Sequence, residues 1–126
     1  ASMKADLEPL STYNSDNPDL SAFRKKGGKV LMFHGLIDPT ISARGSASYT
    51  DSVYEFDVGA KGDVRLFMVP GMGHCGGGPA PEEVNASFAP QANGQGGRER
   101  KLCAYPKKAV FKGTGDGRSP DQFECK

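Results

Sequence analysis

Two short segments of the chain join a group that can carry a proton to a sharp turn. The first is His34-Gly35-Leu36-Ile37-Asp38-Pro39, and the second is Pro70-Gly71-Met72-Gly73-His74-Cys75, which three further glycines follow. If the two segments meet, Asp38 can fix the tautomer of the His74 ring and stabilise its protonated form. His74 can then take a proton from a hydroxyl nucleophile and return it to a leaving alcohol. The pattern indicates acid–base catalysis.

Each of these residues also has a simpler interpretation. An Asp before Pro is usually a turn or cap residue, a lone His among glycines is usually a loop residue, and His34 is better suited to a structural role than to a catalytic one. The simplest interpretation of Cys75 is a buried free thiol, since no second Cys or His stands at ligand spacing from it. We therefore predict neither a metal site nor a cofactor.

Each segment follows an apolar run of strand length. Residues 29–34 read Lys-Val-Leu-Met-Phe-His after a Gly-Gly pair, and residues 64–69 read Val-Arg-Leu-Phe-Met-Val before Pro70-Gly71. Continuous apolar runs of this length are typical of parallel strands that are buried on both faces. Ligands meet the residues just beyond the carboxyl ends of such strands, so both segments are expected at one edge of a sheet.

A helix over residues 43–58 is expected to connect the two strands, with Ser42 as its N-cap. Four apolar residues recur at helical spacing along one face: Tyr49, Val53, Phe56 and Ala60. Strand, helix and strand make a right-handed βαβ unit, which places the fold in the α/β class. An Asp after one strand and a His after the next match the last two members of an α/β-hydrolase triad.

The ends of the chain carry less regular structure. Residues 1–19 are polar and indicate an N-terminal arm, and residues 20–26 can form a short helix that Asp19 caps and Gly27-Gly28 ends. Residues 71–97 are mostly Gly, Pro, Asn, Gln and Ala, which predicts a loop with at most a helical turn at 81–84.

Two cysteines bracket the C-terminal tail. The segment between Cys103 and Cys125 is rich in Gly and holds one possible strand, Ala109–Lys112. A tail with so little periodicity needs a staple to keep one conformation, so we predict a disulfide between Cys103 and Cys125.

The overall composition excludes some partners. The formal net charge is +1, and the basic residues are scattered rather than gathered in a stripe, which argues against a nucleic-acid partner. The longest apolar run, Val30–Phe33, is far shorter than the roughly 20 residues that a membrane span needs, and the N-terminus has no signal-peptide pattern. We expect no membrane partner.

Several motifs together resemble the C-terminal portion of the tannase/feruloyl esterase family. They are Asn17-Pro18-Asp19-Leu20-Ser21-Ala22-Phe23, Gly27-Gly28-Lys29-Val30-Leu31, Phe33-His34-Gly35 with Asp38-Pro39, residues 64–79, and Leu102-Cys103-Ala104-Tyr105-Pro106. The agreement runs in register from about residue 17 to 80 and resumes at about residue 100. A His-Cys-Gly-Gly-Gly segment after Pro-Gly-Met-Gly is a specific signal for this family.

The resemblance implies an α/β-hydrolase that cleaves aromatic acid esters, such as galloyl or hydroxycinnamoyl esters. It implies that Asp38 is the triad acid and His74 the general base. It also implies that Cys75 pairs with a cysteine just before the nucleophilic serine, a mate that this chain lacks, and that Cys103 and Cys125 form a tail disulfide. The family and the cysteine usage together indicate a secreted or periplasmic protein.

The chain departs from the family in lacking the nucleophile. Family members place the serine far upstream in a Gly-Cys-Ser-x-Gly-Gly elbow, with an oxyanion hole and a large lid, whereas Ser42, Ser46 and Ser48 here are better explained as helix-start residues. We therefore expect a C-terminal fragment, or a truncated relative, of a serine carboxylic ester hydrolase that is inactive alone. The alternative is a small non-catalytic binding or assembly protein built on the residual α/β scaffold.

One helix can cover only one face of a strand pair. The other face would expose apolar side chains over an area that rarely stays bare in a soluble monomer. We expect a homodimer or segment-swapped oligomer, a complementing N-terminal portion, or a monomer in which residues 80–102 fold over that face.

Overall fold

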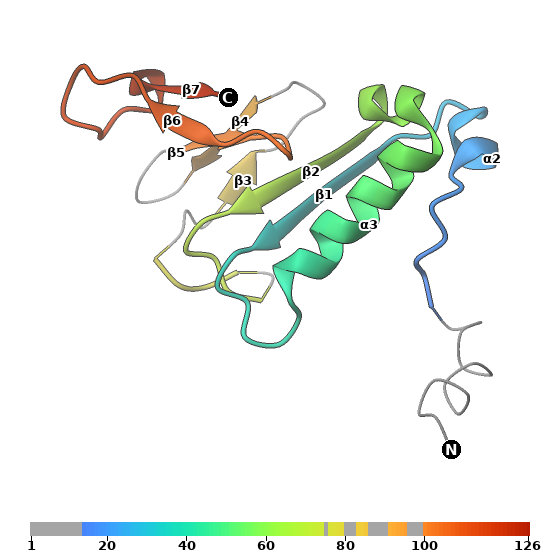
Figure 1. Cartoon of the computed structure of the whole chain (residues 1–126). Coiled ribbons are helices and arrows are strands. Elements are labelled where there is room, and N and C mark those ends of the chain that lie inside the picture. Colours follow the sequence, from blue (N-terminus) through green and yellow to red (C-terminus); the bar gives the residue numbers. More distant parts are fainter. Residues whose placement is uncertain (1–13, 75, 80–82, 86–90, 96–99) are drawn as a thin grey trace.

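A computed structural model describes residues 14–74, 76–79, 83–85, 91–95 and 100–126. Its centre is the predicted βαβ unit, made of strand β1 (Val30–Gly35), helix α3 (Ala43–Phe56) and strand β2 (Val64–Val69) (Figure 1). The two strands pair in parallel, with Phe33 opposite Phe67. The predicted α/β class is confirmed, and β1 begins and ends one residue later than predicted.

Helix α3 packs on one face of the two strands. The Ser42 side chain accepts a hydrogen bond from the backbone N–H of Arg44, which confirms the predicted N-cap. The buried face of α3 consists of Thr50, Val53 and Tyr54, and it packs against Val64, Val30 and Met32 of the sheet. None of these three buried residues is charged, as expected for an amphipathic helix that packs on a sheet.

Phe56 is not part of that face, contrary to the periodicity. Phe56 is 57% exposed, because it points about 120° around the helix axis from Thr50 and so away from the sheet. The helix also ends at Phe56 rather than near residue 58. Asp57 accepts a hydrogen bond from the backbone N–H of Gly59 and starts a short 3₁₀ helix, η2 (Val58–Gly62), which buries Ala60.

The opposite face of the strand pair is covered over β2 alone. Phe67 and Val69 are fully buried there in a cluster with Met72, Leu102 and Ala104. The backbone N–H of Tyr105 donates to the carbonyl of Leu66 over 2.8 Å, which holds the covering segment along the outer edge of β2. Leu31 and Phe33 of β1 are exposed on the same side. The prediction that both strands are buried on both faces is therefore correct for β2 and wrong for β1.

The covering segment belongs to an antiparallel sheet that the sequence did not predict. Strands β3 (Glu83–Asn85), β4 (Gln91–Gln95) and β5 (Arg100–Cys103) are hydrogen-bonded in that order. The expectation of a loop over 71–97 is wrong for β3 and β4, and Glu83 and Val84 are in a strand rather than a helical turn. Composition gave no strand signal for Gln-Ala-Asn-Gly-Gln, so pairing with β5 determines this structure.

The C-terminal tail forms a small hairpin joined to β5. Strands β6 (Ala109–Phe111) and β7 (Phe123–Cys125) pair antiparallel, with a 3₁₀ turn, η3 (Pro120–Gln122), between them. The predicted disulfide between Cys103 and Cys125 is present and links β5 to β7. Because β5 continues into the segment that covers β2, the disulfide ties the tail to the core.

Removing this disulfide should destabilise the chain. The two half-cystines are 22 residues apart, and releasing a loop of that size adds entropy to the unfolded chain worth about 3 kcal/mol. A Cys103→Ala/Cys125→Ala double variant should therefore unfold at lower urea concentration than the wild type. An unchanged midpoint, with tail amides that still resist hydrogen exchange, would show that the β6–β7 hairpin holds without the staple.

The N-terminal part of the described chain docks on the same unit. Helix α2 (Ser21–Arg24) is shorter than the predicted 20–26. Its N-cap residue is Leu20, and Asp19 accepts a hydrogen bond from the backbone N–H of Ser21, so the expectation that Asp19 is the N-cap is off by one residue. Arg24 donates from Nε and Nη2 to the Asp63 carboxylate and also bonds Asp57, which raises the pKa of its guanidinium.

No helix among the described residues is both long enough and apolar enough to cross a membrane.

Candidate active site

Asp38 is held by its own turn. After β1 the chain turns through residues 36–41, and the Asp38 Oδ1 atom accepts hydrogen bonds from the backbone N–H groups of Thr40, at 2.8 Å, and Ile41, at 3.0 Å. This is the geometry in which an Asp side chain mimics a backbone turn. It fixes the carboxylate, whose other oxygen, Oδ2, lies 3.3 Å from Nε2 of His34, and the side chain is only 3% exposed.

Backbone contacts bring the loop after β2 against the loop after β1. The N–H of Leu36 donates to the carbonyl of Val69, and the N–H of Ile37 donates to that of Met72. Gly35 permits this approach, because a Cβ atom at that position would overlap the backbone carbonyl oxygens of Met72 and Gly73. The buried Met72 side chain anchors the second loop in the core on the β2 side.

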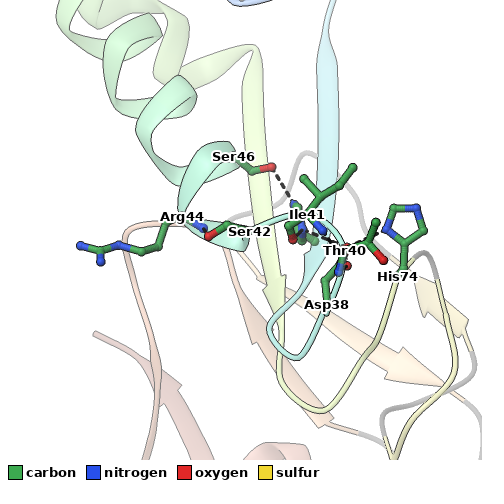
Figure 2. Close-up of polar contacts among 8 residues, drawn as sticks. Asp38, Thr40, Ile41, Ser42, Arg44, Ser46 and His74 are labelled. Carbon is green, nitrogen blue, oxygen red and sulfur yellow. Dashed lines mark hydrogen bonds and ion pairs between the residues drawn. The ribbon is translucent and has the colours of Figure 1, made fainter. Parts of the chain in front are cut away.

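As predicted, the two loops bring Asp38 and His74 together. The Nδ1 atom of His74 lies 2.8 Å from Oδ2 of Asp38, and Figure 2 shows the two side chains reaching toward each other. An ionised carboxylate only accepts hydrogen bonds, so Nδ1 carries the ring proton and Nε2 keeps its lone pair. The His74 side chain is 47% exposed, and no described residue is hydrogen-bonded to Nε2. A neutral ring in this tautomer can accept a proton only at Nε2.

The surroundings of Asp38 favour its ionised form. The hydrogen bond from the Ile41 N–H lowers the pKa of this carboxyl most, burial acts in the opposite direction, and the bonds from His74 and from the Thr40 N–H lower it further. The net result is an Asp38 pKa well below the ordinary value for Asp. Asp38 therefore stays a carboxylate at any pH at which an imidazole can act as a base.

This lowered pKa predicts an acid-dependent loss of stability. Because the pKa of Asp38 is lower in the folded chain than in the unfolded one, its contribution is complete above the unfolded value of about 3.9 and is lost as the pH falls. The difference in unfolding free energy between wild type and Asp38→Asn should shrink as the pH falls below about pH 4. Urea titrations at each pH measure it, with Asp16→Asn, at an exposed position, as the control. A difference that fails to shrink below about pH 4 would contradict the assigned hydrogen bonds.

A second histidine supports the Asp38 turn. His34 is largely buried, with Nδ1 2.7 Å from Oγ of Ser46 and Nε2 3.1 Å from the carbonyl oxygen of Ile41. Since a carbonyl only accepts, Nε2 of His34 is a donor, and Nδ1 can accept the Ser46 hydroxyl proton. Ile41 is also the residue whose N–H binds Asp38, so His34 connects the first turn of α3 to the loop that carries the acid. This agrees with the structural role expected for His34.

The sequence missed part of this arrangement. The sequence indicates only a helix-start role for Ser46, whereas its bond to His34 depends on the packing of α3 beside β1. The N–H donors of Thr40 and Ile41 could have been expected from the Asp-Pro turn. Cys75 lies outside the described residues, so its predicted state stays a prediction. Among the described residues, no group of three or more His, Cys, Asp and Glu side chains could hold a metal ion.

Comparisons with known proteins show which family this chain is similar to. The family model described as "Tannase and feruloyl esterase" matches residues 1–126. A mono(2-hydroxyethyl) terephthalate hydrolase from Piscinibacter sakaiensis is 37% identical, over 92% of this chain and 23% of its own length. Feruloyl esterase B from Aspergillus niger is 30% identical, over 99% of this chain and 31% of its own length. The chain thus spans only about a quarter to a third of these relatives.

Solved structures show the same likeness. Feruloyl esterase B from Aspergillus oryzae superposes with a TM-score of 0.77 at 27% identity, over 86% of this chain and 29% of that structure. The tannin acyl hydrolase of Aspergillus niger superposes with a TM-score of 0.71 at 28% identity, over 94% of this chain and 27% of that structure. Because the family model matches all 126 residues of this chain, the chain belongs to the tannase and feruloyl esterase family.

Proposed function

We propose that this chain is the C-terminal portion of a serine carboxylic ester hydrolase, in which Asp38 is the triad acid and His74 the general base. The observation that carries the proposal is the 2.8 Å contact between Asp38 Oδ2 and His74 Nδ1, with the other ring nitrogen directed to exposed space. The small share of each relative that the chain spans supports a triad serine that lies in another part of the enzyme.

The chemistry assigned to these residues follows from the tautomer. His74 Nε2 accepts the proton of the serine hydroxyl as that oxygen attacks the ester carbonyl, and Asp38 stabilises the resulting imidazolium. His74 then gives the proton to the departing alcohol, and an acyl-serine ester remains. A water molecule, deprotonated in turn by His74, releases the acid and restores the serine. Within this scheme Asp38 orients and stabilises the ring but does not take up the proton.

The names of the relatives suggest the substrate class. They are called feruloyl esterase, tannin acyl hydrolase and mono(2-hydroxyethyl) terephthalate hydrolase, and the feruloyl and terephthalate groups in two of these names are aromatic acyl groups. We infer an aromatic acid ester as substrate of the complete enzyme. The Cys103–Cys125 disulfide supports an oxidising location, so we infer that the protein is secreted or periplasmic.

The exposed side of β1 is consistent with a missing covering element. Leu31 and Phe33 stand on the face that residues 100–104 cover only over β2. In the proposed enzyme an N-terminal portion covers them. The same face would serve self-association if the chain were a small binding or assembly protein, which is the competing function. Activity in a complemented enzyme separates the two.

Purified alone, the chain should not hydrolyse methyl ferulate, methyl gallate or a nitrophenyl ester faster than its His74→Ala variant. An imidazole without a nucleophile or oxyanion donors is a poor esterase, since those groups supply most of the transition-state stabilisation. Initial rates over a range of substrate concentrations measure this. Turnover that disappears when Ser42, Ser46 or Ser48 is replaced would overturn the proposal that the nucleophile lies elsewhere.

A chimera tests the positive side of the proposal. This chain would replace the matching segment of the Piscinibacter hydrolase, to which it is 37% identical. In an active chimera, His74→Ala should lower kcat by about 10⁴-fold, as loss of a triad member does in serine hydrolases. Replacing the exposed Asp116 with Asn is the control and should leave kcat unchanged. A chimera that keeps its activity without His74 would disprove the assignment of the general base.

A further inference from the structure

A pocket of about 340 Å³ lies along the outer edge of β2, away from the candidate active site. Its walls are the C-terminal half of α3, Lys61 of η2, Arg65 of β2 and residues 104–107. Asp38 and His74 lie beyond the carboxyl ends of β1 and β2, whereas Arg65 stands near the start of β2. The four residue-to-residue steps from Arg65 to Val69 separate the two places by roughly 13 Å. The pocket is therefore not part of the acid–base pair.

The pocket has more positive than negative charge. Lys61, Arg65 and Lys107 line it, and none of the ion pairs found in the described part of the chain includes any of them. The acids in its wall are Asp51 and Glu55. Three cations and two carboxylates leave one positive charge. A monoanion would neutralise it.

One of the two acids already has a partner. The Tyr105 hydroxyl donates a hydrogen bond of 2.8 Å to the Asp51 carboxylate, which raises the pKa of Tyr105 and keeps its proton in place. Lys61 lies with its Nζ 5.6 Å from the centre of the Tyr54 ring, a cation–π contact that leaves its N–H groups available to an anion. Tyr54 donates its own hydroxyl proton to the carbonyl of Val64. The two hydroxyls thus have hydrogen-bond partners, whereas none of the three cations is in an ion pair within the described part of the chain.

Arg65 brings an unsatisfied hydrogen-bond donor to the pocket wall. Its Nε atom is buried and has no hydrogen-bond partner among the described residues. A buried donor without an acceptor costs stability, so a ligand that supplied an acceptor to Nε would remove this cost. A carboxylate fits that donor because its two oxygens match the planar fork of a guanidinium. Ala104, Pro106 and the Tyr105 ring form the apolar part of the wall.

We propose that this pocket binds a small organic monocarboxylate, whose charged end is held by Arg65 with Lys61 and Lys107 and whose flat carbon body lies against Tyr105 and Pro106. The volume is within the lower range for small-molecule sites and exceeds what a bare inorganic ion fills. The proposal is independent of the esterase function, because it uses none of the residues assigned to the triad.

Binding of benzoate to the whole 126-residue chain is the test. Titration followed by amide chemical-shift changes should place benzoate at Arg65 and residues 104–107, with a dissociation constant of about a millimolar. Raising the salt concentration should weaken it, since the attraction is between charges near the surface. Benzamide, which has the same ring and no charge, and phosphate, which has charge and no ring, should each bind at least about tenfold more weakly.

Variants locate the site. Arg65→Gln should weaken benzoate binding by about tenfold, since it removes a charged hydrogen bond. Arg65 is partly buried, so a Lys61→Gln/Lys107→Gln double variant at exposed positions provides a second measurement and should also weaken binding. Lys26→Gln is the matched control outside the pocket and should leave binding unchanged. Equal binding of benzamide, shifts that map elsewhere, equal weakening by Lys26→Gln, or no binding at ten times the expected constant would each overturn the proposal.

Discussion

Replacing Phe67 with alanine is expected to lower the free energy of unfolding by about 3–5 kcal/mol, whereas the same change at Phe33 should cost less than about 1 kcal/mol. The two residues are direct partners in the β1–β2 register, so they differ in little but their surroundings. Phe67 is fully buried against Leu102 and Ala104, and its loss leaves a cavity. Phe33 is 48% exposed, so alanine there removes fewer contacts.

Urea unfolding of both variants, at two protein concentrations, measures this difference. If another copy of the chain covers the exposed side of β1, the cost of Phe33→Ala should rise with protein concentration, because association stabilises the folded state. Light scattering would then show a species larger than a monomer. Equal and concentration-independent costs for the two variants would mean that β1 is covered by residues of the same chain. The expected homodimer, oligomer or complemented form stays a prediction until then.

Gly35→Ala is expected to destabilise the chain by about 1–3 kcal/mol and to separate Asp38 from His74. A methyl group at this position would overlap the carbonyl oxygens of Met72 and Gly73, which are backbone atoms that cannot rotate away. The loop after β2 must then move, and with it His74. Nitrogen-15 spectra of the imidazole should show loss of the uniform Nδ1–H tautomer that the Asp38 contact imposes.

Gly45→Ala is the matched control and should have the opposite sign. Gly45 lies within α3, and a Cβ atom there would have no neighbour within 4 Å. Alanine in place of glycine within a helix stabilises by about 0.5–1 kcal/mol. If Gly35→Ala were as harmless as Gly45→Ala, and the His74 tautomer unchanged, the close approach of the two loops would be wrong.

Local patterns in the sequence were sufficient for the elements that position the site. The apolar runs predicted β1 and β2, and Ser42 predicted the start of α3. Because Asp38 and His74 follow successive strands, the sequence also predicted that they meet at one edge of the sheet. Parallel strands joined by a helix bring their carboxyl ends together whatever the loops contain, so the pairing followed from topology. The spacing of Cys103 and Cys125 around an aperiodic tail gave the disulfide.

Tertiary structure alone decided which faces are covered and which strands form without an apolar pattern. An apolar run shows that a strand can be buried but not by what, so Leu31 and Phe33 are exposed while Phe67 is enclosed by Leu102 and Ala104. Strand β4 forms because its backbone pairs with that of β5. Every residue type except proline has the same backbone donor and acceptor, so this pairing cannot be predicted from the residues of β4. The bonds of His34 to Ser46 and Ile41 likewise depend on the distance between α3 and β1, which is set by packing and not by local sequence.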